Sequence, residues 1–138
     1  MDADATLRDV VPLNTALLIE DNADVAYLLQ YMLQRDGYAV QTLGNGRDAQ
    51  QYIAESQATD VVILDLMLPY IDGYELLTQI RESTSWREVP VVVLSGKVSE
   101  RDIVRAIELG ADDFVTKPYK PLELSARIRR CINNAKHR

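Results

Sequence analysis

The chain has 138 residues, 47% hydrophobic and 26% charged, and this composition is typical of a single folded domain rather than a disordered chain. Its formal net charge of −6 makes the chain a poor binder of nucleic acid, and we expect no direct nucleic-acid contact. Its one cysteine, Cys131, excludes an intramolecular disulfide or a cysteine-based zinc site. No apolar run reaches membrane-spanning length and the N-terminus lacks a signal-peptide pattern, so we expect a cytoplasmic protein that does not contact membranes.

Segments with the pattern of strands alternate along the chain with segments of helical periodicity. They form five strand–helix units, which in chain order are strand 15–20 and helix 22–37, strand 38–43 and helix 46–56, strand 60–65 and helix 72–83, strand 89–95 and helix 99–110, strand 112–117 and helix 121–136. Residues 1–14 are acidic and aperiodic, which predicts a flexible arm. We therefore expect a folded domain over 15–135 and a basic tail over 136–138.

Glycine, proline and apolar spacing indicate where these helices end and which faces they bury. Gly37 and Gly110 suit the carboxyl-terminal ends of two helices, and Pro121 suits a first turn, where its missing N–H is not needed. In the first predicted helix, four apolar side chains at helical spacing predict the face that packs on the core: Val25, Leu28, Leu29 and Met32.

The strands predicted over 60–65 and 89–95 are apolar almost throughout instead of alternating. A strand with this pattern is buried on both faces, as in a parallel sheet that helices cover on each side. The regular alternation of strands and helices with short connections favours the same arrangement. The sequence therefore predicts an α/β fold built on one open five-stranded parallel sheet.

Polar side chains stand at the carboxyl ends of four of the five predicted strands. In strand order they are Glu20 and Asp21, Asp65, Ser95, and Lys117. Because ligands of open α/β sheets bind at the carboxyl ends of the strands, we expect these side chains to converge. Clustered carboxylates either share a proton or hold a hard cation, and a set of oxygen ligands alone favours Mg²⁺.

These side chains are sufficient to accept a phosphoryl group. An aspartate can attack phosphorus and form an aspartyl-phosphate. A metal ion and a lysine neutralise charge during the transfer, and a serine hydroxyl can bond to one phosphoryl oxygen. The chain has neither a G-x-x-x-x-G-K-[ST] loop nor a G-x-G-x-x-G pattern, which argues against a free nucleotide as the ligand.

Four segments resemble the receiver domains of two-component response regulators. They are LLIEDN (17–22), ILDLMLPYIDG (63–73), VVVLSG (91–96) and GADDFVTKPY (110–119). The segments follow one another in the family's order, and the resemblance extends over residues 15–135, nearly the whole chain. It implies the flavodoxin-like fold of receiver domains, with strand order 2-1-3-4-5 and helices on both faces of the sheet.

The resemblance implies a role for each acidic residue. Asp65 is the implied phosphoacceptor, and its implied donor is a sensor histidine kinase or a histidine phosphotransfer protein. The implied cofactor is Mg²⁺, held by Asp65, directly by Asp21 and through water by Glu20. The backbone carbonyl of Met67 is the implied fourth contribution of the protein to the metal site.

The resemblance also implies a conformational switch. Ser95 is the implied switch hydroxyl, and Lys117 is the implied cation that pairs with the phosphoryl group and precedes a cis bond to Pro118. Phe114 is the implied switch aromatic, which moves inward when Ser95 moves. The family more often has tyrosine at this position, and phenylalanine has no hydroxyl to stabilise its outward position.

The segment GADDFVTKPYKPLELSARIRR (110–130) resembles the winged-helix transcription-factor subfamily of response regulators. The charged residues that carry this resemblance are Asp112, Asp113, Glu123 and Arg127. It implies a homodimer on phosphorylation, through the fourth helix, fifth strand and fifth helix, and an output in transcription. The alternative is a solvated face with incidental ion pairs. The chain is expected to be either a stand-alone regulator or the receiver of a longer protein.

Each predicted site residue also has a simpler alternative role. Asp21 or Asn22 suits the cap of the following helix, Ser95 suits an ordinary turn, and Lys117 suits an exposed surface. Without the resemblance, two apolar residues would be assigned to the core: Met67 and Phe114.

Two classes of function stay open. The favoured class is a phosphorylation-switched signalling domain that is no enzyme beyond its own phosphoryl transfer and slow autodephosphorylation. The alternative is a receiver-like interaction module that works without phosphorylation. A haloacid-dehalogenase-type phosphatase would need an Asp-x-Asp pattern, which residues 65–67 lack, and a flavodoxin-like cofactor carrier would need a phosphate loop after the first strand.

Overall fold

Strands and helices alternate along the computed structural model, which describes residues 14–96 and 99–137. The strands are Asn14–Ile19 (β1), Tyr38–Leu43 (β2), Val61–Leu64 (β3), Val91–Ser95 (β4) and Asp113–Thr116 (β5). The helices are Ala23–Arg35 (α2), Gly46–Glu55 (α3), Gly73–Glu82 (α4), Glu100–Glu108 (α5) and Pro121–Lys136 (α6). Every predicted element is present, with bounds that differ from the predicted ones by at most two residues. The arm predicted over 1–14 lies outside the described residues except for Asn14.

The five strands form one parallel sheet in the order β2-β1-β3-β4-β5, as the sequence and the resemblance predicted. Its register sets the ends of the strands level. Ile19 of β1 pairs with both Leu43 of β2 and Leu64 of β3, so the residues that follow β1 and β3 emerge side by side. Ser95 of β4 pairs with Thr116 of β5 at the same edge.

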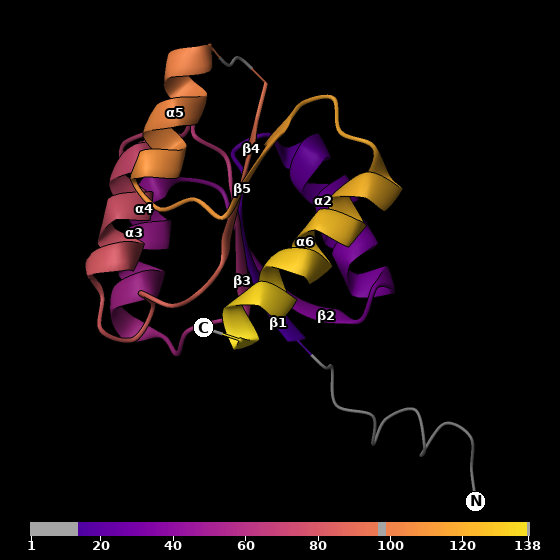
Figure 1. Ribbon diagram of the computed structural model, residues 1–138, viewed down its shortest axis with the longest axis horizontal. Helices are drawn as coiled ribbons and strands as arrows, with labels where there is room; N and C mark the ends of the chain where they lie inside the picture. The colour runs from indigo at the N-terminus through magenta and orange to yellow at the C-terminus, as the bar shows by residue number, and fades with distance from the viewer. Residues whose placement is uncertain (1–13, 97–98, 138) are drawn as a thin grey trace, which may run out of the picture.

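Helices cover both faces of the sheet, with α3, α4 and α5 on one side and α2 and α6 on the other (Figure 1). Alternate residues of β3 enter the two cores: Val62 packs with the first group of helices, and Ile63 with the second. One prediction for α2 was wrong, because the Leu28 side chain is 60% exposed rather than buried. Among the described helices, none is both long and apolar enough to cross a bilayer.

The ends of the helices follow local rules that the sequence contains. Asn22 caps α2, because its side-chain oxygen accepts hydrogen bonds from the backbone N–H groups of Asp24 and Val25. Gly37 and Gly110 lie just beyond helix ends with φ values of +97° and +106°, a conformation that favours glycine. The helix-capping role that was open to both residues therefore belongs to Asn22. Asp21 does not cap α2 and lies at the carboxyl edge of the sheet.

Gly73 lets α4 begin directly against the strand that precedes it. Its N–H donates to the carbonyl of Leu66 at 3.0 Å. A Cβ atom at this position would lie 2.6 Å from the Leu66 Cα and 2.7 Å from the Asp65 carbonyl oxygen. Because backbone atoms cannot yield as a flexible side chain does, only glycine fits here without moving the segment after β3.

Replacing Gly73 by alanine is expected to destabilise the domain by about 1–3 kcal/mol, although alanine is otherwise the better helix former. The change in the free energy of unfolding is measured by urea denaturation followed by circular dichroism. Gly44→Ala is the matched control, since a Cβ there would lie 4.0 Å from its nearest neighbour, the Glu20 carbonyl oxygen. Equal effects of the two substitutions would contradict the proposed close contact.

Candidate functional site

A cleft opens at the carboxyl edge of the sheet, between the segments that follow β1, β3, β4 and β5. The residues that line it are Glu20, Asp21, Asn22, Val25, Asp65, Met67, Gly96 and Lys117. The level register of β1 and β3 brings Glu20 and Asp65 together, although 45 positions separate them in the sequence. The fold thus places four predicted side chains and Met67 around one cavity.

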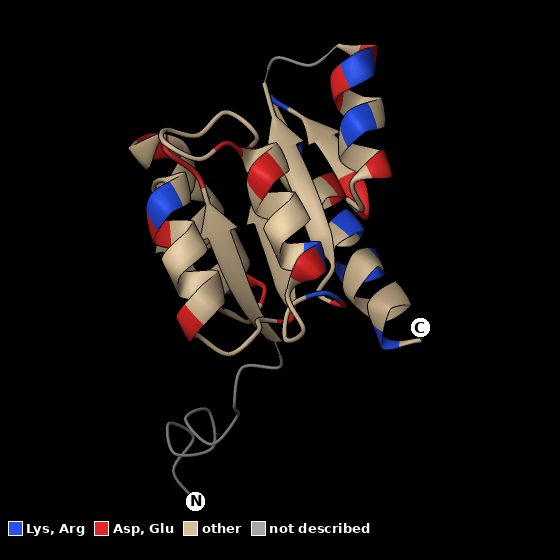
Figure 2. Cartoon of the chain, turned by 90° about the vertical axis from the view of Figure 1, so that its left-hand side faces the viewer, with Lys and Arg blue, Asp and Glu red and all other residues tan. Residues whose placement is uncertain are grey.

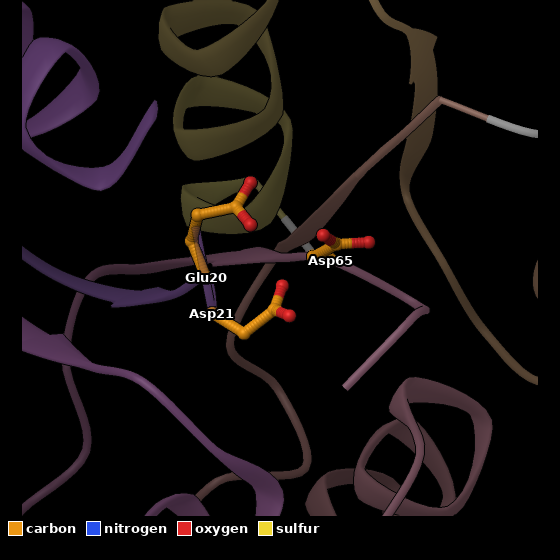
Figure 3. Close-up of side chains that lie close together, drawn as sticks. All are labelled: Glu20, Asp21 and Asp65. Atoms are coloured by element: carbon orange, nitrogen blue, oxygen red, sulfur yellow. The ribbon is translucent and has the colours of Figure 1, made fainter. Parts of the chain in front are cut away.

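Three carboxylates meet in this cleft. One oxygen each of Glu20, Asp21 and Asp65 lies within 4.8 Å of the other two. Figure 3 shows the three side chains, with Glu20 and Asp21 from one segment and Asp65 from its neighbour. Glu20 and Asp65 are buried, whereas Asp21 is exposed at the mouth. Three carboxylate oxygens this close together are a candidate ligand set for a hard divalent cation.

Lys117 offsets part of this negative charge from the other side of the cleft. Its Nζ donates to Glu20 Oε1 at 2.5 Å and to Asp65 Oδ2 at 3.2 Å. The backbone N–H of Lys117 donates to the carbonyl of Ser95 at 2.9 Å, which ties the lysine to the end of β4. The bond from Lys117 to Pro118 is cis, as the resemblance predicted.

Backbone N–H groups hold the remaining oxygens of the two buried carboxylates. Met67 N–H donates to Asp65 Oδ1 at 2.9 Å, and Asn22 N–H donates to Glu20 Oε2 at 3.2 Å. Each carboxylate therefore has one oxygen toward its own loop and the other toward Lys117. Such hydrogen bonds fix the orientation of a carboxylate, so Asp65 presents a defined face to the cleft.

The Ser95 hydroxyl is buried without a hydrogen-bond partner. The residue is 1% exposed, and its Oγ is one of two buried, unpaired side-chain oxygens in the described part of the chain. An unsatisfied buried hydroxyl is unfavourable and uncommon in folded proteins. Its position at the end of β4 therefore points to a ligand atom that completes it.

Electrostatics distinguish Glu20 from an ordinary surface glutamate. Burial is the main cause that raises the pKa of Glu20 to about 7, and the neighbouring Asp65 raises it further. The hydrogen bond from Lys117 acts in the opposite direction and lowers it. For Lys117, burial alone would lower the pKa, but the hydrogen bond to Glu20 and the charge of Asp65 raise it overall. The lysine is thus a permanent cation, and Glu20 is near its protonation midpoint at neutral pH.

The structure separates the predicted site residues into two groups. Ser95 and Phe114 do not line the cleft; Phe114 is half-buried on β5, where it pairs with Val93 and packs against the core beside α4 and α5. Met67 is 62% exposed at the cleft, which rules out the alternative role in the core.

Sequence reasoning did not assign three residues that line the cleft: Asn22, Val25 and Gly96. Asn22 and Gly96 directly follow the predicted strand ends at Asp21 and Ser95, which is a signal that pointed to the cleft. No sequence signal pointed to Val25 as a cleft residue, because its helical spacing indicates a core residue. It reaches the cleft because it lies in the first turn of α2, next to the end of β1.

Comparison with known proteins agrees with this geometry. The sequence pattern of the response regulator receiver domain matches residues 16–129. The chain belongs to this family. Receiver domains are signalling modules rather than classical enzymes, and membership implies a histidine kinase as partner.

Two curated regulators are similar to the chain over its receiver region. The regulatory protein VanRc of Enterococcus gallinarum is 42% identical over 113 residues, which cover 82% of this chain and 47% of VanRc. The alkaline phosphatase synthesis transcriptional regulatory protein PhoP of Bacillus subtilis is 39% identical, over 86% of this chain and 48% of PhoP. The chain thus spans about half the length of these relatives, and the similarity supports the relation to transcriptional response regulators over the receiver region.

A solved receiver domain carries a metal at the corresponding kind of site. The receiver domain of the sensor histidine kinase PA1611 from Pseudomonas aeruginosa is 29% identical, with a TM-score of 0.79. The alignment covers 87% of this chain and 98% of that domain, whose structure has a magnesium ion coordinated in the active site cleft.

The raised pKa of Glu20 makes the stability of the metal-free domain depend on pH. The pKa is about 7 in the folded chain and 4.5 ordinarily, so between these values the folded chain binds more protons than the unfolded chain. The free energy of unfolding is therefore expected to fall as the pH rises through this window. Glu20→Gln, which does not titrate, is expected to flatten the decline.

Urea unfolding in EDTA at several pH values between about 5 and 8 measures this slope. Glu75→Gln, an exposed glutamate in the first turn of α4, is the matched control and should keep the wild-type slope. A wild-type slope in Glu20→Gln would assign the pH dependence to other groups.

Proposed function

We propose that the chain is the phosphoacceptor of a two-component phosphorelay, and that Asp65 takes the phosphoryl group from a histidine kinase or a histidine phosphotransfer protein. The observation that carries the proposal is the convergence of Asp65, two further carboxylates and Lys117 on one cleft. The cytoplasm, where such kinases use ATP, is the proposed location.

The residues at the cleft fit a magnesium ion. Glu20, Asp21, Asp65 and the backbone carbonyl of Met67 would supply oxygen donors only, which suits Mg²⁺ better than a transition metal. The carboxylates outnumber the single cation, Lys117, so the cluster has negative charge to offset. When bound, Mg²⁺ supplies positive charge beside the oxygens of the transferred group.

The side chains have complementary tasks in the proposed transfer. An oxygen of Asp65 forms the new O–P bond while the P–N bond of the donor phosphohistidine breaks, and the donor imidazole, protonated on its other ring nitrogen, keeps the electron pair and leaves as the neutral base. Lys117 Nζ, which now contacts Asp65 Oδ2, pairs with a phosphoryl oxygen. The unpaired Ser95 hydroxyl donates to another oxygen, which gives this buried group its missing partner.

The proposed switch connects the cleft with β5. Ser95 and Phe114 stand on adjacent strands, where Ser95 pairs with Thr116 and Phe114 with Val93. A movement of the Ser95 hydroxyl toward the phosphoryl group leaves space beside β4, and we propose that Phe114 turns inward to occupy it. The surface of α5, β5 and α6 then changes with phosphorylation, as in a two-state equilibrium that a covalent modification shifts.

Asp65→Asn is expected to abolish phosphorylation by acetyl phosphate, because the amide cannot attack phosphorus. Intact mass spectrometry in the presence of Mg²⁺ should show one added phosphoryl group on the wild type and none on the variant or in EDTA. Asp48→Asn, an exposed aspartate on α3, is the matched control and should remain labelled. Absence of labelling on the wild type would instead favour an interaction module that works without phosphorylation.

We further propose that phosphorylation produces a homodimer through α5, β5 and α6. Charges of both signs alternate along α5, the helix that follows the short grey gap at the top of Figure 2. On α6, Arg127 and Arg130 pair with Asp113 of β5 at 3.1 and 3.2 Å. Exposed Val104 and Ile107 add apolar area on α5. A second copy presents the same arginines and the same aspartate. In a dimer with a two-fold axis, the arginines of one copy can therefore pair with the aspartate of the other.

Replacing Ile107 by aspartate is expected to prevent dimerisation, since the side chain is exposed and a charge there would be buried in the interface. Sedimentation velocity with beryllofluoride and Mg²⁺ should show a dimer for the wild type and a monomer for Ile107→Asp. Tyr27→Asp places the same charge at an exposed position on α2 and should leave the dimer intact. A monomeric wild type with bound beryllofluoride would rule out this interface.

Control of transcription is the output that we propose for the protein, because PhoP, which this chain resembles over its receiver region, is a transcriptional regulatory protein. The folded unit proposed for this task is the receiver domain over residues 15–135, with the predicted arm and basic tail on either side.

A further inference from the structure

Tyr74 links α4 with α5, two helices that β4 separates along the chain. The residue lies in the first turn of α4, and its phenol O–H is 3.1 Å from Asp102 Oδ1 and 3.3 Å from the Asp102 carbonyl oxygen on α5. Burial, together with the hydrogen bond to Asp102, raises the pKa of Tyr74, so the phenol stays protonated and acts as the donor. One hydroxyl thus connects the start of α4 with the start of α5.

The same contact has a second component. The guanidinium carbon of Arg105, one turn along α5, lies 4.0 Å from the centre of the Tyr74 ring, a favourable cation–π arrangement. Asp102 also belongs to the capping box of α5, where its Oδ2 accepts from the Ser99 N–H at 3.0 Å. Tyr74 therefore contacts Asp102, which belongs to the capping box of α5, and Arg105, which lies one turn further along the helix.

Helix α5 buries few side chains, and Arg81 of α4 holds the chain just beyond its carboxyl end through hydrogen bonds to the Gly110 carbonyl. Of its nine residues, Ala106 alone is buried, whereas α4 buries Gly73, Leu76, Leu77 and Ile80 over ten residues. Because hydrophobic burial is the main stabilising contribution to helix packing, the position of α5 depends on few contacts. The Tyr74 contact is consequently the polar contact that holds the first half of α5 against α4, as Arg81 holds its far end.

Tyr74 is also close to the phosphoacceptor along the backbone. It follows Gly73, whose missing side chain lets α4 pack directly on the carbonyl of Asp65 and the Cα of Leu66. Contacts therefore run from Asp65 to Gly73, and from Tyr74 to Asp102 and Arg105. In the same conformation Lys117 Nζ contacts Asp65 Oδ2 at 3.2 Å, and the Ser95 Oγ has no hydrogen-bond partner among the described residues.

We propose that Tyr74 is a positioning residue that holds α5 in the phosphoryl-free conformation and thereby lowers the affinity of the cleft for the phosphoryl group. The inference rests on the proposed function of Asp65. A contact that is made in one state and lost in the other shifts the equilibrium between the states by its own free energy. Loss of the Tyr74 hydroxyl therefore increases the population of the conformation that binds the phosphoryl group.

The test is the affinity of Tyr74→Phe for beryllofluoride in the presence of Mg²⁺, with bound ligand measured by fluorine NMR. Phenylalanine keeps the ring beneath Arg105 and removes only the hydrogen bonds. The dissociation constant is expected to fall by about two- to tenfold, the factor that one net hydrogen bond represents. Tyr31→Phe, an exposed tyrosine on α2, is the matched control and should bind like the wild type.

Thermal unfolding of the same proteins separates positioning from a structural role. A positioning role predicts that Tyr74→Phe lowers the melting temperature of the free domain and leaves that of the beryllofluoride-bound domain nearly unchanged. Equal losses in both states, with unchanged affinity, would overturn the inference while the proposed function stands. Failure of the wild type to bind beryllofluoride would overturn the proposed function and the inference with it.

Discussion

The arrangement of this domain depends on the repulsion between carboxylates that the sheet holds in one cleft. Glu20 and Asp65 are buried at the ends of adjacent strands, and Asp21 stands at the mouth. Buried like charges are strongly unfavourable unless a cation offsets them. Lys117 is the one such cation that the described residues place in the cleft, and it is shared between two carboxylates. The metal-free site is therefore incompletely neutralised, which leaves it with a strong preference for added positive charge.

The sheet can hold this unfavourable cluster because its own packing is strong. Strands β3 and β4 are buried over their whole length, and the parallel register fixes the carboxyl ends of β1 and β3 at one level. Gly73 then returns the chain against the backbone of Asp65 without a side chain between them. Stability is thus concentrated in the centre of the sheet, and the destabilising charges lie at its edge, in a cleft where Asp21 is the only one of the three carboxylates exposed to solvent.

Sequence reasoning recovered the fold and the cluster because both follow from regular rules. Apolar runs indicated the buried strands, and polar residues at their ends indicated the cleft, so Glu20, Asp65 and Lys117 were placed together before any contact was known. It failed for Leu28, where apolar character indicated burial. Exposure of that side chain depends on whether a neighbouring element covers it, which no local pattern contains. The Tyr74–Asp102 contact was missed for a similar reason, because it joins residues 28 positions apart.

The unequal anchoring of the helices determines where a change at Asp65 has its effect. Helix α4 packs through several buried side chains and begins against the backbone of Asp65, so a displacement of this helix would disturb the core. Helix α5 buries one residue and is joined to α4 by a polar contact whose strength depends on geometry. A small displacement at the cleft therefore changes polar contacts of α5 at a lower free-energy cost than it changes the core. The same helix exposes Val104 and Ile107, so the helix with the fewest buried side chains also has apolar surface to offer a partner.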